Sequence, residues 1–192
     1  MLRHRGTVEI RTPRLLLRRL QPSDAGSIHA NWGADPEVYR YMTSPIMPEL
    51  DDVRAFLEKK QTQYLSRSFY YWGVTPADDP DEVIGMTTLT EISDFSRTAN
   101  LAYTIGRPWW HRGLATEAAG AVMAFAFSEV GFRKLYGCHF TENVRSGRVL
   151  TALGMEHKGR GRTPVWQDGR YLTYENYELT APAWARRKRG KA

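Results

Sequence analysis

The sequence contains a single cysteine, Cys138, among its 192 residues, so no disulfide bond can form within the chain. Its five histidines are scattered, and no Cys/His spacing typical of a zinc site is present. No run of about 18 apolar residues occurs, which argues against a membrane-spanning helix. The Arg-bearing N-terminal segment lacks the apolar core of a signal peptide. We therefore expect a cytoplasmic protein that needs neither disulfide bonds nor metal ions and has no membrane partner.

Most of the chain also carries little net charge. The formal net charge is +6, and five of the positive charges lie in residues 186–191. Without these five, the basic residues nearly equal the 21 acidic ones. We expect residues 186–192 to form a disordered basic tail, whose nucleic-acid role would be limited to a weak, salt-dependent contact with RNA.

The order of the expected elements indicates a mixed α/β domain. A chain of this length with 42% hydrophobic residues forms one domain that buries roughly 70% of the surface its unfolded chain exposes. We expect this domain to span residues 1–185. Alternation of apolar residues, turn residues and cap residues predicts strands at 10–20, 69–75, 83–93, 100–106 and 135–140, short helices starting near Ser23 and Asp35, and helices over 50–66, 114–130 and 141–153.

The most informative segment is a turn at residues 109–113 and the Ala-rich helix that follows it. The first N–H groups of a helix lack intrahelical partners, and the helix macrodipole adds partial positive charge there, so such a turn can hold a phosphate. Gly113 and Ala115 keep the backbone accessible to a ligand oxygen. The strand expected at 100–106 completes the strand–turn–helix order of phosphate-binding loops. An ordinary helix start has similar small residues, so the turn alone does not identify a site.

A second motif follows the strand expected at 135–140. Glu142, Asn143 and Ser146 begin a short helix that ends near Gly154, a residue type that commonly ends helices. This pattern resembles the second motif of the GNAT acyltransferases, Glu-Asn-x-x-Ser-x-x-x-Leu-x-x-Leu-Gly-Phe, with Met155 in place of the final Phe.

The remaining parts of the resemblance come in the family's order. The family's pyrophosphate loop, Gln/Arg-x-x-Gly-x-Gly/Ala, is similar to residues 110–115, and the Thr-Glu-Ala that follows it is similar to residues 116–118. Residues 12–18 resemble the family's first strand. The chain therefore resembles the Rim-type (RimJ/RimL-like) branch, which acetylates protein N-termini, over most of residues 10–184.

This resemblance implies a GNAT fold within the α/β (α+β) class: a central, twisted, mixed but mostly antiparallel sheet of about seven strands, flanked by helices. It implies acetyl-CoA as the co-substrate, bound where the strand at 99–105 splays from the strand at 136–140. No metal ion is implied. The residues expected to bind acetyl-CoA are Tyr103, Thr104, Ile105, His111, Arg112, Gly113, Leu114, Ala115, Thr116, Asn143 and Ser146.

The departing CoA thiolate needs a group that supplies a proton or a hydrogen bond. Many GNAT enzymes have a Tyr for this purpose at the position of Leu150, which cannot donate. Ser146 lies one turn earlier on the same helix face. Because a Ser there is thought to serve the thiolate in the Rim-type branch, the resemblance assigns this catalytic role to Ser146; an ordinary solvated serine is the alternative. Asn143 would orient the cofactor or a water, and it is also a helix N-cap candidate.

The base that takes the proton from the amine is a carboxylate in our interpretation. We favour Glu91, at the end of the strand expected at 83–93, over Asp94, although either could simply solvate a loop. The Rim-type branch often has an Asp near Thr173, which this chain lacks. Either Glu175, two residues later on the same strand face, takes the place of this Asp as a base candidate, or the substrate differs. Glu142 is expected to orient the second motif.

Two residues depart from the family's loop pattern. Trp110 replaces Gln/Arg, and an indole cannot form an amide's hydrogen bonds, so the entry to the loop is expected to be packed. His111 replaces a Gly and is expected to be a solvated loop residue rather than the base.

The sequence therefore predicts an N-acetyltransferase that moves the acetyl group of acetyl-CoA to a primary amine, first of all the N-terminal α-amine of a protein or peptide of the ribosomal-protein type. A small amine metabolite or an antibiotic is the alternative acceptor, and a non-catalytic acyl-CoA sensor is a third hypothesis. A homodimer is a further expectation. Aromatic residues that could line an acceptor groove or belong to the core are Trp32, Tyr39, Tyr41, Tyr70 and Tyr71.

Overall fold

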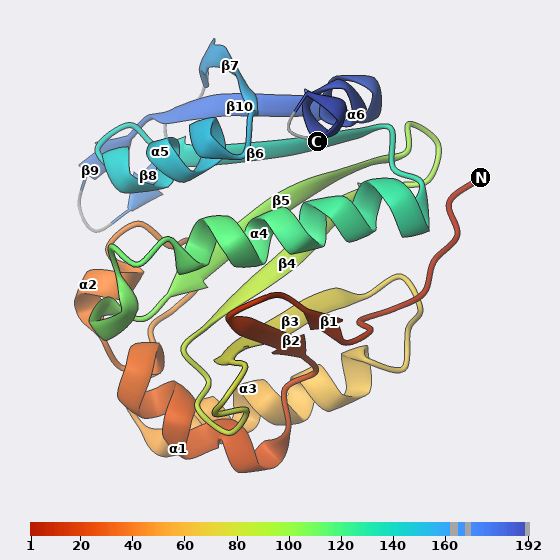
Figure 1. The fold of residues 1–192 in the computed structure, drawn as a ribbon. Coiled ribbons are helices and arrows are strands. Elements are labelled where there is room, and N and C mark those ends of the chain that lie inside the picture. The colour runs from red at the N-terminus through yellow and green to blue at the C-terminus, as the bar shows by residue number, and fades with distance from the viewer. Residues whose placement is uncertain (162–164, 168–169, 191–192) are drawn as a thin grey trace. The chain divides into compact units, whose positions relative to one another are not determined.

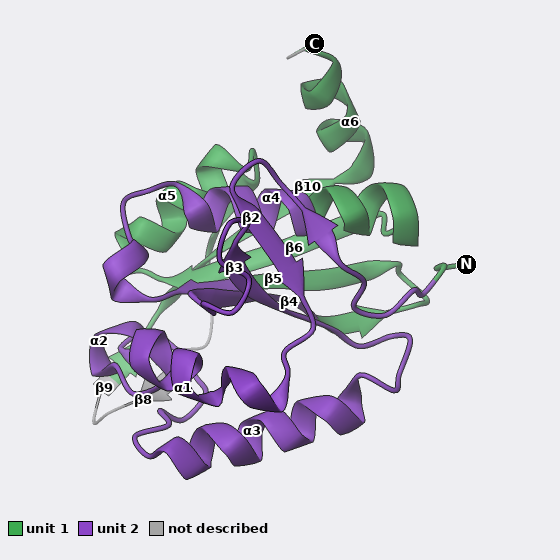
Figure 2. Cartoon of the chain, turned by 60° about the horizontal axis from the view of Figure 1, so that its bottom comes forward, with its two compact units in different colours: residues 1–3, 90–102, 123–192 green, residues 4–89, 103–122 purple. Residues whose placement is uncertain are grey.

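The computed structural model describes residues 1–161, 165–167 and 170–190. The chain divides into two compact units (Figure 2). Unit 2 contains residues 4–89 and 103–122, and unit 1 contains residues 1–3, 90–102 and 123–192. Strand β4 (Gly85–Ser93), strand β5 (Thr98–Ile105) and helix α4 (Leu114–Phe125) have residues in both units.

The sheet of unit 2 has the strand order β1-β2-β3-β4-β5, and β1 (Ile10–Arg11), β2 (Leu15–Arg18), β3 (Tyr70–Pro76) and β4 pair antiparallel. The single strand expected at 10–20 is therefore wrong, because the chain turns between β1 and β2. Thr12 N donates to Leu15 O over 2.9 Å and closes this turn at Pro13, whose fixed φ favours it.

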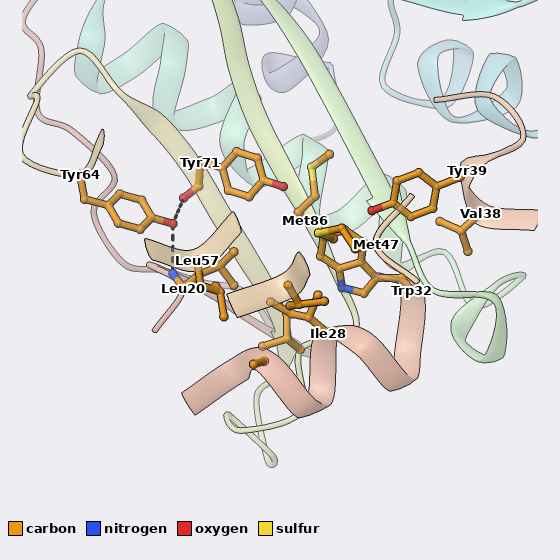
Figure 3. Packing of buried hydrophobic residues seen from close by; sticks show 13 residues of the cluster. Leu20, Ile28, Trp32, Val38, Tyr39, Met47, Leu57, Tyr64, Tyr71 and Met86 are labelled. Carbon is orange, nitrogen blue, oxygen red and sulfur yellow. Dashed lines mark hydrogen bonds between the residues drawn. The ribbon is translucent and has the colours of Figure 1, made fainter. Parts of the chain in front are cut away.

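Helices α1 (Ala25–Ile28), α2 (Pro36–Tyr39) and α3 (Leu50–Gln63) and the π-helical segment η2 (His29–Gly33) contribute to the core of unit 2. Figure 3 shows how the Tyr64 hydroxyl joins this core, accepting from Leu20 N at 3.0 Å and donating to Tyr71 O at 2.8 Å.

The start of the first helical segment differs from the expectation. A 3-10 turn, η1 (Pro22–Asp24), precedes α1, and the Asp24 carboxylate accepts from Gln21 N at 2.7 Å. The expected N-cap at Ser23 is therefore wrong. Asp35 does begin α2, since its side chain accepts from Glu37 N.

The aromatic residues that could have lined a groove are mostly core residues. Trp32, Tyr39, Tyr70 and Tyr71 are at most 9% exposed, whereas Tyr41 is half-buried.

The sheet of unit 1 has the strand order β4-β5-β6-β10-β7. Strand β6 (Lys134–Phe140) runs parallel to β5, while β10 (Tyr174–Thr180) is antiparallel to both β6 and β7 (Glu156–Arg160). Strands β8 (Val165–Gln167) and β9 (Arg170–Leu172) form a separate hairpin. The prediction of mixed but mostly antiparallel pairing is confirmed, and in the described part of the chain the main sheet has eight strands rather than about seven.

The two helices that carry the motifs begin and end near the predicted positions. Helix α4 continues into a π-helical turn, η4 (Ala126–Val130), which ends at Gly131 with a φ of 89°. Helix α5 (Val144–Ala152) packs on β6 (Figure 1). The Asn143 side chain caps α5 by accepting from Ser146 N at 3.3 Å, and Gly154 follows the helix with a φ of 82°.

The basic end of the chain is helical. Helix α6 (Ala181–Arg189) begins at Thr180, whose hydroxyl accepts from Ala183 N at 3.4 Å, and its Trp184 ring lies 5.4 Å from the Phe127 ring. The expectation of a disordered tail is therefore wrong for residues 186–189, whereas residues 191–192 lie outside the described part. A single domain over residues 1–185 stays a prediction. No helix among the described residues is long and apolar enough to cross a membrane.

Candidate active site

The turn before α4, in unit 2, presents its backbone to solvent. His111 and Gly113 have φ values of 63° and 74°, and both residues are exposed. The helical ladder begins with the bond from Glu117 N to Gly113 O at 3.1 Å, so the N–H groups of residues 114–116 precede the ladder. A Cβ on Gly113 would have Arg14 Nη2, 3.7 Å away, as its nearest neighbour. The turn therefore has the backbone geometry to receive an anionic oxygen.

The entry to this turn is packed, as predicted from Trp110. The Trp110 side chain packs against the core cluster of unit 2, and its indole N–H donates to Ile105 O over 2.7 Å. Trp109 Nε1 donates to Asn31 Oδ1 over 3.3 Å, and the Arg112 guanidinium lies 5.0 Å from the centre of the Trp109 ring.

Three more expected cofactor residues, at the end of β5, also belong to unit 2. Ile105 is 7% exposed and its carbonyl already accepts from Trp110, so it has little left to offer a ligand. Thr104 Oγ1 points toward Met42 Sδ at 3.6 Å, and Tyr103 is half-buried. The side chains of Tyr103 and Thr104 are both partly exposed.

Glu117, in the first turn of α4, ties the turn to the start of β2. Its carboxylate accepts from Thr12 Oγ1 at 2.6 Å, from Arg14 N at 3.1 Å and from Arg14 Nε at 2.6 Å. Arg14 Nη1 also donates to Arg112 O over 3.0 Å. Burial alone would raise the pKa of Glu117, but the hydrogen bonds from Thr12 and Arg14 and the charge of Arg14 outweigh it and lower that pKa.

In unit 1, strands β5 and β6 pair over a short length only. Their parallel register joins Thr98 to Lys134, Ala99 to Leu135 and Asn100 to Tyr136. From Gly137 to Phe140, β6 pairs with β10 on its other side. Within the described part of unit 1, the β5–β6 register stops at Asn100, which is the divergence expected of a strand pair that admits a ligand.

Glu91 lies in β4 where the strand backbone is irregular. Its φ is 49°, a left-handed conformation that is uncommon outside glycine, and its side chain is exposed. Burial and the nearby Glu91 carboxylate together raise the pKa of the Cys138 thiol on β6. The alternative base Asp94 lies in the exposed turn between β4 and β5.

Glu175, the third base candidate, is engaged by several donors. Its carboxylate pairs with His157 Nε2 at 2.7 Å and Arg160 Nε at 3.1 Å, and it accepts from Thr141 Oγ1 at 3.3 Å. The hydrogen bonds from His157 and Arg160 lower the pKa of Glu175. A carboxylate with a lowered pKa is a weaker base, so Glu175 is poorly suited to take the amine proton.

Ser146 and Leu150, two residues of the second motif, lie four residues apart and therefore on one face of α5. Ser146 is half-buried, and Leu150 is 1% exposed, with its Cδ2 packed against the backbone of Gly137. A separate groove of about 430 Å³ has a lining that does not include Asn143 or Ser146. The residues lining it are His139, Val144, Gly147, Arg148, Thr151, Ala152 and Tyr177.

Comparison with known proteins decides the family. The family model "Acetyltransferase (GNAT) domain" matches residues 14–156. The chain belongs to the GNAT acetyltransferase family. The chain is 27% identical to an uncharacterized N-acetyltransferase of Bacillus subtilis (strain 168), YoaA, over 173 residues, covering 90% of this chain and 97% of that protein. It is 25% identical to the [Ribosomal protein uS5]-alanine N-acetyltransferase of Escherichia coli (strain K12) over 185 residues, covering 92% of this chain and 93% of that protein.

Solved structures support the same fold. A GNAT-family acetyltransferase from Bacillus anthracis has a TM-score of 0.80 at 19% identity, covering 91% of this chain and 99% of that chain. The ribosomal-protein-S5-alanine acetyltransferase of Vibrio fischeri also has a TM-score of 0.80, at 15% identity, covering 92% of this chain and 98% of that chain. The GNAT fold predicted from the sequence is therefore confirmed.

Membership in this GNAT family gives the protein N-acetyltransferase activity with acetyl-CoA as co-substrate. The residues of the turn fit that co-substrate, because the N–H groups of residues 114–116 precede the helical ladder and the exposed Gly113 carries no side chain that would block a phosphate oxygen. The hypothesis of a non-catalytic sensor is not supported.

One set of functional candidates in this GNAT enzyme, Thr12, Arg14 and Glu117, was not predicted from the sequence. The available signal was that residues 12–18 and residues 116–118 each resemble a motif of the family. Their contact could not be predicted, since Thr12 and Glu117 are 105 residues apart in the sequence.

Proposed function

We propose that this acetyltransferase acetylates the N-terminal α-amine of a protein or peptide. One observation carries the proposal: the relative named [Ribosomal protein uS5]-alanine N-acetyltransferase aligns over 92% of this chain and 93% of its own length. An alignment of that extent includes both the turn before α4 and the second motif. A cytoplasmic location, where ribosomal proteins are made, belongs to the proposal.

The pyrophosphate of acetyl-CoA is bound, in this proposal, by the backbone of residues 111–116. Backbone groups of Tyr103 and Thr104 contact the pantetheine arm, and Asn143 orients the cofactor or a water in addition to capping α5. Ser146 donates a hydrogen bond to the departing thiolate, which strengthens as negative charge develops on sulfur. Ser146→Ala is expected to lower turnover by about 10²-fold with little change in acetyl-CoA affinity.

Glu91 is the proposed general base. An α-ammonium group must lose a proton before its nitrogen can attack the thioester carbonyl, and an exposed carboxylate can take that proton directly or through one water. When the C–S bond breaks, the nitrogen loses its second proton, CoA leaves as a thiolate and takes up that proton, and the proton first accepted by Glu91 passes to solvent. The amide product and free CoA account for all atoms of the amine and acetyl-CoA.

The acceptor is tested by measuring thiol release from acetyl-CoA with matched amines. The first substrate is a peptide with a free N-terminal Ala and one internal Lys. The second is the same peptide with a blocked N-terminus, and the third is a set of small polyamines and aminoglycosides. We expect CoA release with the free peptide alone, and mass spectrometry should place the acetyl group on its α-nitrogen. Faster release with a small amine, or equal release with the blocked peptide, would overturn the assignment.

Two partner predictions belong to the same proposal. A weak RNA contact would now be made by the exposed basic end of α6, and we expect it to weaken steeply with added salt. A homodimer would appear in sedimentation at twice the mass of the 22.0 kDa chain.

A further inference from the structure

The bonds of Glu117 and Arg14 hold the turn before α4 in one orientation. The Glu117 carboxylate binds the Thr12 hydroxyl and the Arg14 backbone N–H, so it fixes the start of β2 against the first turn of α4. The Arg14 guanidinium then binds the same carboxylate through Nε and Nη2, both at 2.6 Å. We call Thr12, Arg14 and Glu117 the clasp.

The clasp reaches the phosphate-binding backbone itself through Arg14 Nη1, which donates to Arg112 O over 3.0 Å. A peptide group is planar and trans, so its C=O and N–H point in opposite directions. Because the Arg112 carbonyl is held toward Arg14, the N–H of Gly113 in the same peptide group points away from Arg14. This peptide would otherwise be free to rotate, since Gly113 has a φ of 74° and lies in an exposed turn.

We propose that the clasp is a positioning device for acetyl-CoA, in which Glu117 holds Arg14, and Arg14 fixes the Arg112–Gly113 peptide so that its N–H faces the pyrophosphate. The inference rests on the proposed role of residues 111–116 in binding the pyrophosphate. It adds residues whose side chains need not touch the acetyl group or the acceptor. Their loss should raise the KM for acetyl-CoA while leaving turnover at saturation nearly unchanged.

The negative charge of Glu117 allows a positioning effect on acetyl-CoA binding to be distinguished from a purely electrostatic effect. A carboxylate near a bound pyrophosphate repels it, so neutralising Glu117 should tighten acetyl-CoA binding if charge alone mattered. If the clasp acts by positioning, neutralising Glu117 should instead weaken acetyl-CoA binding. Glu117→Gln replaces one acceptor oxygen with an NH2 group that faces the donors of Thr12 and Arg14, so hydrogen bonds that hold Arg14 in place are lost. We therefore expect the Kd for acetyl-CoA to rise by at least about tenfold.

The experiment measures acetyl-CoA binding by calorimetry for the wild type, Glu117→Gln, Arg14→Ala and Thr12→Val. The matched control is Arg11→Ala, which removes the same charge from a side chain that pairs with Glu9 at 3.0 Å on the surface. Thermal melting of each variant checks that it is folded. If Glu117→Gln fails to fold, Arg14→Lys serves in its place, because a lysine cannot bind the carboxylate and the Arg112 carbonyl at once.

A second ligand separates positioning from a general loss of structure. S-acetylpantetheine lacks the pyrophosphate, so turnover with it should be nearly equal in the wild type and the clasp variants. An unchanged or tighter Kd for acetyl-CoA in Glu117→Gln, or an equal loss with S-acetylpantetheine, would overturn the proposal. Failure of the wild type to bind acetyl-CoA would instead reject the pyrophosphate role of residues 111–116, and the identity of the acceptor affects neither result.

Discussion

Glu91 combines an exposed carboxylate with a left-handed backbone near the end of β4. Such conformations cost about 1–3 kcal/mol and cluster at functional sites, where the surrounding structure maintains them. The irregular backbone gives Glu91 a side-chain direction that a regular strand residue would not have. This is independent support for its proposed role as the base, beyond its position near the end of the strand.

If Glu91 accepts the amine proton, Glu91→Gln should lower turnover by about 10²–10⁴-fold, because glutamine keeps the shape but cannot accept a proton. The affinity for acetyl-CoA should change little. Steady-state kinetics and calorimetry on the same variant test both statements. Asp94→Asn, in the neighbouring turn, is the matched control and should retain wild-type turnover; a loss there alone would transfer the role to Asp94.

Leu150 occupies the position at which many family members have a tyrosine, and the structure explains why a tyrosine does not suit this chain. Leu150 is 1% exposed and packs on the backbone at Gly137. Leu150→Tyr should therefore lower the free energy of unfolding by about 1–3 kcal/mol through overpacking, whereas Leu150→Met should cost less than about 1.5 kcal/mol. Urea denaturation measures both. A Leu150→Tyr variant of unchanged stability with raised turnover would show that the site does accept a phenol.

At the scale of elements, the turn before α4 depends on the backbone freedom of Gly113. Its φ of 74° disfavours any side chain, although the space around it is open. Gly113→Ala therefore tests the backbone conformation separately from side-chain bulk, and the left-handed conformation should cost alanine about 1–2 kcal/mol. We expect acetyl-CoA affinity to fall roughly tenfold in Gly113→Ala and further in Gly113→Val, whose branched Cβ adds bulk beside the amides.

The control for this prediction is Gly26→Ala in α1. Gly26 has a helical environment with nothing within 4 Å of an added Cβ, so its replacement should leave affinity unchanged and stabilise the helix slightly. Equal acetyl-CoA affinity of folded Gly113→Ala and wild-type protein in calorimetry would contradict the importance of the turn.

Local sequence signals located the elements well where the deciding interactions were also local. Asn143 caps α5 by accepting from Ser146 N, three residues away, and Gly154 follows the end of the helix. The residue types at these positions therefore indicated both boundaries of the helix. The division of the first strand was missed although Pro13 was visible, because several apolar residues in a row suggested continuity. The clasp could not be found in this way, since its bonds join residues more than 100 positions apart.

At the scale of the whole molecule, the basic C-terminal segment illustrates the limit of composition. A run of Arg and Lys is typical of a solvated end, yet α6 forms, with Arg187 lying against Gly154 at the end of α5. A cation near a helix C-terminus stabilises the helix, by about 0.3–1 kcal/mol. The sequence showed the charge but not the distant helix end that it meets.

Arg187→Ala should therefore lower the free energy of unfolding by about 0.3–1 kcal/mol, and deletion of residues 186–192 should lower it at least as much. Chemical denaturation of the two variants measures the effect. Arg189→Ala removes an equal charge from the exposed end of α6 and should be nearly neutral. A deletion variant as stable as the wild type would show that this segment contributes nothing to the fold.

Cys138 gives the protein a built-in attachment point for a reporter group. It is the chain's single thiol; the residue reaches the surface on β6, while partial burial of its sulfur and the Glu91 carboxylate raise its pKa. A maleimide fluorophore can therefore be placed at one known position without mutagenesis. Because only the thiolate reacts, the labelling rate should increase with pH, and Glu91→Gln should shift that increase to lower pH. The alkylation rate of one sulfur thus reports the charge state around the proposed base in the absence of any substrate.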